Sequence, residues 1–191
     1  MESERKNGVE GKGIMGSNSK SFGVCDLLLR VLALLLTLVA TIVLGVDKQT
    51  TVVPVKLVDT LPAVNVAVTA KWHYLSAFVY MVVANAIACA YAALSLLLTL
   101  ANRGKSKGLG TMIIILDALM VALLFSGNGA ATAVGLLGYQ GNSHVRWNKV
   151  CNVFDKFCNQ VAAAIVVSLV GSAAFLLLVL VPVLKIHRQI N

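Results

Sequence analysis

Four apolar stretches dominate the sequence, and each is long enough to cross a lipid bilayer as a helix. A spanning helix requires about 20 predominantly apolar residues, and every one of the four meets that length. The pattern predicts an all-α membrane protein, a four-transmembrane-helix bundle whose membrane domain covers residues 25–184. The predicted helices cover about residues 27–46, 74–100, 109–137 and 161–184.

The composition of the chain favours a membrane protein over a soluble domain. Of its 191 residues, 58% are hydrophobic and 13% are charged, and the mean hydropathy is +0.85. A soluble domain of this length could not bury so much apolar surface, so the lipid bilayer is the expected partner. The net charge of +8 does not indicate a nucleic-acid partner, because Lys and Arg are spread over tails and loops between the apolar stretches.

The two ends of the chain are interpreted as tails outside the membrane. Residues 1–24 are polar, rich in glycine and mixed in charge, so we expect a disordered tail, followed at the other end by a short tail of residues 185–191. The stretch 27–46 is longer than the apolar core of a typical signal peptide, and no convincing cleavage site ends it. We therefore interpret it as the first membrane helix.

The distribution of Lys and Arg predicts how the bundle is oriented. Four spans place both termini on one side of the membrane. The short loop 101–108 holds three cations and the tails add more, whereas the loops 47–73 and 138–160 carry three cations each over much longer stretches. By the positive-inside rule, both termini and the short loop are cytoplasmic, and the two long loops lie outside.

Two charged residues within the predicted spans, Arg30 and Asp117, are expected to form an intramembrane ion pair. Each costs about 2.5–3.5 kcal/mol at membrane depth unless it finds a partner. Both helices enter from the cytoplasm in this topology, and each charge then lies about 10 Å into the bilayer. One alternative is that Arg30 reaches the lipid headgroups and leaves Asp117 neutral or hydrated. The other is that Asp117 titrates in a proton or ion path, which would need further polar groups along the span.

Small residues recur at every fourth position of three predicted helices, which lets helix backbones approach closely. Such faces serve either the chain's own bundle, the favoured interpretation, or an interface between subunits. Asn85 and Asn128, also inside spans, are expected to hydrogen-bond across helices. The small-residue positions are Ala84, Ala88 and Ala92, then Gly127, Ala131 and Gly135, and finally Ala164, Ser168 and Ser172.

The cysteines and histidines indicate a disulfide and neither a metal site nor catalysis. Cys151 and Cys158 face an oxidising compartment in the predicted topology and are close enough in sequence to bond, the alternative being two buried thiols. Cys25 is either palmitoylated or an unmodified thiol, and Cys89 is interpreted as a small packing residue. No CxxC pair accompanies the histidines, and the three histidines are scattered. We expect no metal, no cofactor, no small-molecule substrate and no enzymatic activity.

The first long loop, residues 47–73, is rich in β-branched residues and is interrupted by prolines. Such a composition indicates a short extended segment, which we expect to lie on the bundle. No set of catalytic side chains is visible in it.

Several of these features together resemble the Casparian strip membrane domain protein family of plants, CASP and CASP-like proteins, which are distantly similar to MARVEL-domain proteins. The resemblance rests on Arg30, on Asp117, on the stretch 69–80 and on the loop 141–158. The spacing in that loop is most similar to CASP-like subfamily 1. The residues that carry the spacing are Trp147, Lys149, Cys151, Phe154, Phe157 and Cys158.

The resemblance implies a plasma-membrane protein that forms homodimers or higher oligomers and heteromers with related family members. In the best understood members, the resemblance further implies a scaffold for a membrane domain that faces the cell wall. The first long loop departs from the pattern of the strip-forming members, so a generic CASP-like scaffold is the expected function. The alternative is a small transporter or channel that uses Asp117.

Overall fold

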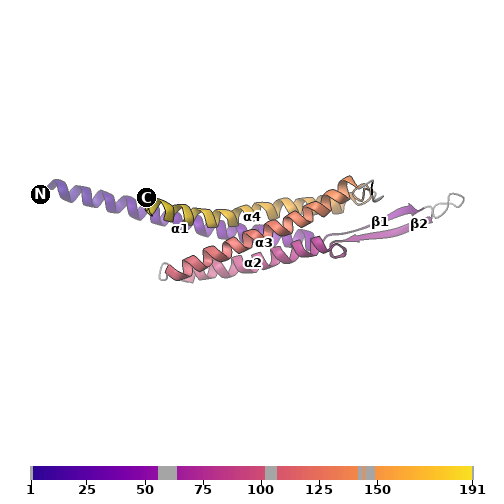
Figure 1. Ribbon diagram of the computed structural model, residues 1–191, viewed down its shortest axis with the longest axis horizontal. Helices are drawn as coiled ribbons and strands as arrows, with labels where there is room; N and C mark the ends of the chain where they lie inside the picture. Colours follow the sequence, from indigo (N-terminus) through magenta and orange to yellow (C-terminus); the bar gives the residue numbers. More distant parts are fainter. Residues whose placement is uncertain (1, 56–63, 102–106, 142–143, 145–148, 191) are drawn as a thin grey trace.

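The computed structural model of the chain is a bundle of long helices with a β-hairpin at one end (Figure 1). The structure describes residues 2–55, 64–101, 107–141, 144 and 149–190. The elements in chain order are α1 (Glu2–Gly45), β1 (Lys48–Val55), β2 (Val64–Lys71), the short 3-10 helix η1 (Trp72–Tyr74), α2 (Ser76–Ala101), α3 (Lys107–Gln140) and α4 (Asp155–Ile190).

Each of the four α-helices contains a segment that is long and apolar enough to cross a membrane, which confirms the predicted fold class. These segments start and stop within a few residues of the predicted ones, except that the fourth begins six residues earlier. The segments are Gly23–Gly45, Ser76–Ala101, Gly110–Gln140 and Asp155–His187.

The first and last helices extend beyond the predicted membrane spans toward the ends of the chain. The prediction places residues 1–24 in a disordered tail, whereas α1 begins at Glu2, and α4 continues through most of the predicted tail 185–191 to Ile190. Helix nucleation is costly but propagation adds one hydrogen bond for each residue, so an existing membrane helix can extend beyond its apolar part. Amino-acid composition alone does not predict this extension of a helix into a polar segment.

The helices form a ring in which α1 and α3 lie on opposite sides. Helix α1 packs against α2 and α4, and α3 packs against the same two helices. The two chain termini lie at one end of the bundle, called here the terminal end, and the hairpin extends from the other, called the hairpin end (Figure 1). A residue of α1 can therefore meet a residue of α3 only across the interior of the bundle.

The first long loop forms a two-stranded antiparallel hairpin, with Lys48 opposite Lys71 at its base. The predicted extended segment is present, but the hairpin projects beyond the helices instead of lying on them (Figure 1). Eight residues in each strand span roughly 26 Å, so only the base can reach the bundle. There, the side-chain oxygen of Gln49 accepts a hydrogen bond from the backbone N–H of Phe157 at 2.8 Å.

Two apolar clusters fill the interior of the bundle. One lies toward the hairpin end and the other toward the terminal end, so that all four helices contribute to the core. The first includes Leu44, Phe78, Met81, Ala131, Phe154, Phe157, Val161 and Ala164, and the second includes Ala33, Ala88, Ala92, Leu124, Ala174, Phe175 and Leu178.

The predicted small-residue faces of α2 and α4 lie inside this bundle, where all six residues are buried. On α3, a Cβ atom at Gly127 would lie 3.3 Å from the Cβ of Ala84, so these two helices are in close contact. Ala131 is also buried. Gly135 differs, because a Cβ atom there would meet nothing within 4 Å. Within the described chain, eight of the nine positions thus face neighbours in the same molecule, and one borders open space.

Candidate functional site

The structure places Arg30 of α1 and Asp117 of α3 together across the interior of the bundle. The guanidinium donates two roughly parallel hydrogen bonds to the carboxylate, Nη2 to Oδ2 at 3.2 Å and Nη1 to Oδ1 at 3.4 Å. This two-pronged geometry is the favoured arrangement of an Arg–carboxylate pair. Because α1 and α3 are on opposite sides of the ring, the pair ties the two diagonal helices to each other.

Three further residues complete the cluster around this pair, and the sequence-based prediction did not include them. Asp26 accepts from Arg30 Nε at 3.1 Å, Ser95 Oγ accepts from Nη1 at 3.0 Å, and the Tyr91 hydroxyl donates to Asp117 Oδ1 at 2.8 Å. Asp26 could have been identified, because it precedes Arg30 by four residues on one helix face. Tyr91 and Ser95 carry no comparable signal, since their position depends on how α2 is rotated.

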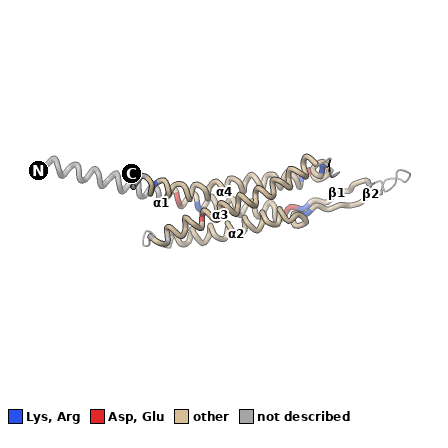
Figure 2. Tube along the Cα trace, viewed as in Figure 1, with Lys and Arg blue, Asp and Glu red and all other residues tan. Residues whose placement is uncertain are grey.

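The cluster is closed to solvent and to lipid at its centre. Asp117 is 0% exposed and Arg30 is 4% exposed, while the Asp26 side chain is partly exposed on the terminal side. Charged residues of the described chain gather toward the two ends of the bundle and leave its middle uncharged (Figure 2). A buried charge is tolerated only when it is paired and hydrogen-bonded, and both conditions are met at Arg30 and Asp117.

A second set of buried polar residues lies in the middle of the bundle and joins α2, α3 and α4. Ser168 Oγ donates to Asn85 Oδ1 at 2.9 Å, and Asn128 Nδ2 donates to Ser172 Oγ at 3.2 Å. Asn85 Nδ2 in turn donates to the backbone of its own helix at 2.9 Å. Both asparagines thus make the cross-helix bonds expected of them, and these bonds stay within the chain.

An apolar layer separates these two polar groups. Leu124, Phe175 and Leu178 belong to one core cluster and are 0%, 0% and 2% exposed. From Asp117 to Asn128 along α3 is roughly 16 Å at the rise of an α-helix, and Leu124 lies between them. Within the described residues, Asp117 is therefore not connected to the middle of the bundle by a row of polar side chains.

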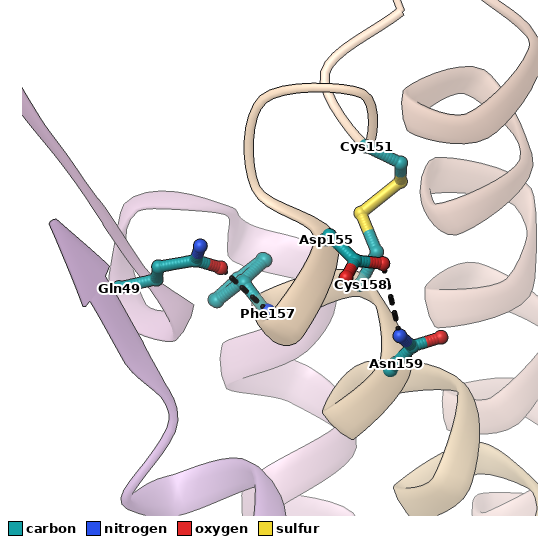
Figure 3. Close-up of a disulfide and its surroundings, with 6 residues drawn as sticks. All are labelled: Gln49, Cys151, Asp155, Phe157, Cys158 and Asn159. Carbon is teal, nitrogen blue, oxygen red and sulfur yellow. Dashed lines mark hydrogen bonds between the residues drawn. A yellow bond between two sulfur atoms is a disulfide. The ribbon is translucent and has the colours of Figure 1, made fainter. Parts of the chain in front are cut away.

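At the hairpin end, a disulfide joins Cys151 to Cys158, with their Cα atoms 5.6 Å apart, which confirms the predicted bridge (Figure 3). The bridge ties the segment before α4 to the first turn of that helix. Next to it, Asn159 donates a hydrogen bond to Asp155 at 3.0 Å, and Gln49 of β1 accepts from the backbone of Phe157 (Figure 3). The disulfide-bridged segment and the hairpin base are thus held against the same helix.

The other residues of the predicted loop motif divide into buried and exposed positions. Phe154 and Phe157 are buried in the core cluster of the hairpin end, and the Phe157 ring lies 6.1 Å from that of Phe78. Lys149 is exposed. Trp147 lies outside the residues that the structure describes. The two phenylalanines therefore anchor the bridged segment to the bundle, and Lys149 is available on its surface.

Asp47, just beyond α1 at the hairpin end, is a second buried carboxylate that the sequence-based analysis did not single out. It is 1% exposed, and neither carboxylate oxygen has a hydrogen-bond partner. Burial raises the pKa of Asp47 to about 6, although the nearby charge of Lys156 acts in the opposite direction. The folded protein thus holds the neutral form of this side chain more readily than the unfolded chain does.

We expect Asp47→Asn to remove a pH dependence of stability. Because the folded-state pKa is raised, the stabilisation from Asp47 is complete below about pH 4 and is lost as pH rises to about 6, at about 1.4 kcal/mol per pH unit at most. Unfolding in detergent micelles between pH 4 and 7 measures this slope. Asp155→Asn, at an exposed position, is the control. An unchanged slope in Asp47→Asn would assign the pH dependence to another group.

The remaining cysteines are unbonded, Cys25 on the surface of α1 and Cys89 partly buried in α2. No group of three or more His, Cys, Asp or Glu side chains in the described parts of the chain is arranged to hold a metal ion. The buried polar contacts between helices described above are an ion pair and hydrogen bonds.

Comparison with known proteins agrees with this arrangement. The family description "Casparian strip membrane protein domain" matches residues 19–174, a range that includes the ion pair and the disulfide. The chain belongs to this family. CASP-like protein 1E1 of Glycine max is 70% identical over 87% of this chain and 89% of that protein. CASP-like protein 1E2 of Glycine max is 66% identical over 95% of this chain and 98% of that protein. CASP-like protein 1E1 of Populus trichocarpa is 60% identical over 99% of each chain. No solved structure matches the chain.

Membership in the Casparian strip membrane protein domain family confirms the resemblance inferred from the loop 141–158 and the two intramembrane charges. It also agrees with a location in a membrane, which the four apolar helices indicate independently. The matched relatives are plant proteins whose names state a family and no reaction.

Proposed function

We propose that this CASP-domain protein is a non-enzymatic scaffold of the plasma membrane, with both termini in the cytoplasm. It assembles laterally into homodimers or higher oligomers and into heteromers with related family members. Its hairpin and its disulfide-bridged segment face the cell wall, where they organise a membrane domain.

The main support for this proposal is that the buried polar residues of the bundle bond to one another. Asp117 is held by Arg30 and Tyr91, and the polar residues in the middle of the bundle bond to each other. Breaking such buried pairs is costly, so they favour one rigid helix arrangement over an alternating one. A transporter that uses Asp117 would need a hydrated row of polar groups, and the apolar layer at Leu124 and Phe175 argues against it.

The shape of the hairpin end supports a role in contacts outside the bilayer. The hairpin extends beyond the helices, and the disulfide fixes the neighbouring segment against α4. Three apolar residues of the hairpin are exposed: Val52 by 59%, Val66 by 42% and Val68 by 40%. The hairpin has only two strands, so the outer edge of each strand carries unpaired backbone groups. Exposed apolar residues and free strand edges are the features by which strands recruit partners.

The test is the behaviour of a fluorescently tagged chain in plant cells. We expect confinement to patches of the plasma membrane with slow recovery after photobleaching, and co-purification of two differently tagged copies. Lys185→Cys and Lys149→Cys provide a matched pair for topology: an impermeant maleimide should label only the second from outside. A uniformly mobile, monomeric protein contradicts the scaffold, and proton flux through purified protein in vesicles would favour the transporter.

A further inference from the structure

One face of the hairpin base is docked on the bundle. Gln49 and Ala70 lie directly opposite each other in the two strands. Gln49 accepts a hydrogen bond from the backbone N–H of Phe157 at 2.8 Å, and Ala70 packs against the apolar cluster of the hairpin end. The first N–H groups of a helix have no partner within that helix, so Gln49 caps α4 from outside. Farther along, the strands project away from the helices (Figure 1).

Asp47 lies in the short connection between the bundle and this docked base. Helix α1 ends at Gly45 and β1 begins at Lys48, so Val46 and Asp47 are the whole connection. The backbone N–H of Asp47 donates to the carbonyl of Leu44 at 3.1 Å, which holds the connection in a turn against the end of α1. A movement of Asp47 out of this turn would also move Gln49, its near neighbour in the chain.

The surroundings of Asp47 favour a neutral carboxyl group. The residue is 1% exposed, and neither side-chain oxygen has a hydrogen-bond partner among the residues that the structure describes. Asp47 also follows the last turn of α1, where the negative end of the helix dipole disfavours a further negative charge. An ionised carboxylate is costly to bury without hydrogen bonds. Ionisation therefore requires that water reach Asp47, which the docked base prevents.

Other charged groups at the hairpin end act on Asp47 only weakly. The described side chains there that carry a charge or titrate below pH 8 include Lys48 on β1, Lys71 on β2, His73 in η1, His144, and Asp155 and Lys156 on α4. The charge of Lys156 favours the ionised form of Asp47, but the effect of burial is larger. Burial raises the pKa of Asp47 to about 6.

We propose that Asp47 is a proton-sensitive latch, which keeps the hairpin base docked on α4 while its carboxyl group is protonated and releases the base when the group ionises. In the released state water hydrates the carboxylate, and Gln49 no longer caps the N–H of Phe157. The compartment whose pH is sensed rests on the proposed function, in which the hairpin faces the cell wall. The latch itself does not depend on that orientation.

The expected size of the effect follows from the pKa of Asp47 in the two states. In the released base the carboxyl group has its ordinary pKa of 3.8, against about 6 in the docked one. Docking is therefore strongest below about pH 4 and weakens as pH rises toward 6, where the docked form also begins to ionise. Each pKa unit is a factor of about ten, so the ratio of docked to released protein should fall about a hundredfold between pH 4 and pH 7.

The experiment measures hydrogen exchange of the Phe157 amide in the purified full chain in detergent micelles. Its protection factor, the intrinsic exchange rate divided by the observed rate at the same pH, should fall about a hundredfold from pH 4 to pH 7. At each pH it should stay below the protection factor of the Leu178 amide, because Leu178 is buried in the middle of α4 and its amide is exposed only by unfolding of the bundle.

Three variants assign the proton to Asp47. Asp47→Asn keeps the shape of a neutral carboxyl group, so the protection factor of Phe157 should no longer change with pH. Lys156→Gln removes the charge that favours ionisation, so the decline should extend to higher pH than in the wild-type protein, and this variant decides the test if Asp47→Asn does not fold. Asp155→Asn removes an exposed carboxylate at the same end and should leave the decline unchanged.

Three outcomes would overturn the latch. A constant protection factor of Phe157 in the wild-type protein would show that ionised Asp47 is accommodated in the docked base, with Lys156 as its partner. A decline that persists in Asp47→Asn would assign the proton to another group, such as His73 or His144. Equal protection of Phe157 and Leu178 would show that the base leaves α4 only when the bundle unfolds. None of these results bears on the side of the membrane that the hairpin faces, which the maleimide labelling tests separately.

Discussion

Replacing Arg30 with Leu is expected to destabilise the bundle by about 3–5 kcal/mol, because it leaves Asp117 as an unpaired charge at a fully buried site. Asp117→Asn should cost less, about 1–3 kcal/mol, since Arg30 retains Asp26 and the new amide oxygen can still accept from Tyr91. The structure thus predicts that Arg30→Leu lowers the stability of the bundle more than Asp117→Asn does.

The double variant Arg30→Leu/Asp117→Asn should be more stable than the sum of the single effects indicates. Removing both charges deletes the desolvation penalty together with the attraction, so we expect a coupling of about 0.5–3 kcal/mol. Unfolding of the purified proteins in detergent micelles measures each free energy, and oligomer recovery from membranes gives a second readout.

Asp26→Asn serves as the control for this cycle. The side chain of Asp26 is 36% exposed, so solvent weakens its ion pair with Arg30. The expected loss of stability is therefore within about 1 kcal/mol. Strictly additive single effects would show that Arg30 and Asp117 do not act as a unit. A transporter that uses Asp117 predicts a different pattern, in which the double variant folds but remains inactive.

Removing the disulfide by Cys151→Ser/Cys158→Ser is expected to cost about 2–3 kcal/mol, the loop-closure entropy for residues seven apart. The effect should concentrate at the hairpin end, where Phe154 and Phe157 are buried on the bridged segment. Either single substitution should cost as much as the double one, because both remove the same covalent bond.

Thermal unfolding of the oxidised protein measures this difference, and hydrogen exchange at the start of α4 locates it. Cys25→Ser/Cys89→Ser is the matched control, since those two cysteines are unbonded and should leave the bridge intact. Alkylation of Cys151 and Cys158 in the unreduced native protein would contradict the bridge. Unchanged stability in the double variant would show that Phe154 and Phe157 suffice to fix the segment.

The ion pair and the disulfide were predictable because both follow from the order of residues along the chain. Charges are so unfavourable within apolar stretches that Arg30 and Asp117 are expected to be paired once both are at similar depth. Cys151 and Cys158 are close enough in the chain that bonding requires little chain organisation. Asp26 could have been added by the same reasoning, as it lies one turn from Arg30.

Other contacts depend on how helices are rotated and tilted, which the sequence specifies only through packing of the whole core. Tyr91 and Ser95 meet the ion pair because one face of α2 turns toward it. Asp47 is buried at the base of the hairpin, where Gln49 of β1 bonds to Phe157 of α4, a residue 108 positions away in the chain. No local pattern indicates either contact.

The sequence by itself determined the number, length and approximate ends of the membrane helices, because the hydrocarbon thickness converts apolar length directly into a span. Only the tertiary structure decided that the hairpin projects beyond the bundle and that Gly135 borders open space, although Gly135 belongs to the same small-residue pattern as Gly127. The physical reason is that spacing at every fourth residue selects a helix face, and the neighbours of that face are set by the packing of all four helices together.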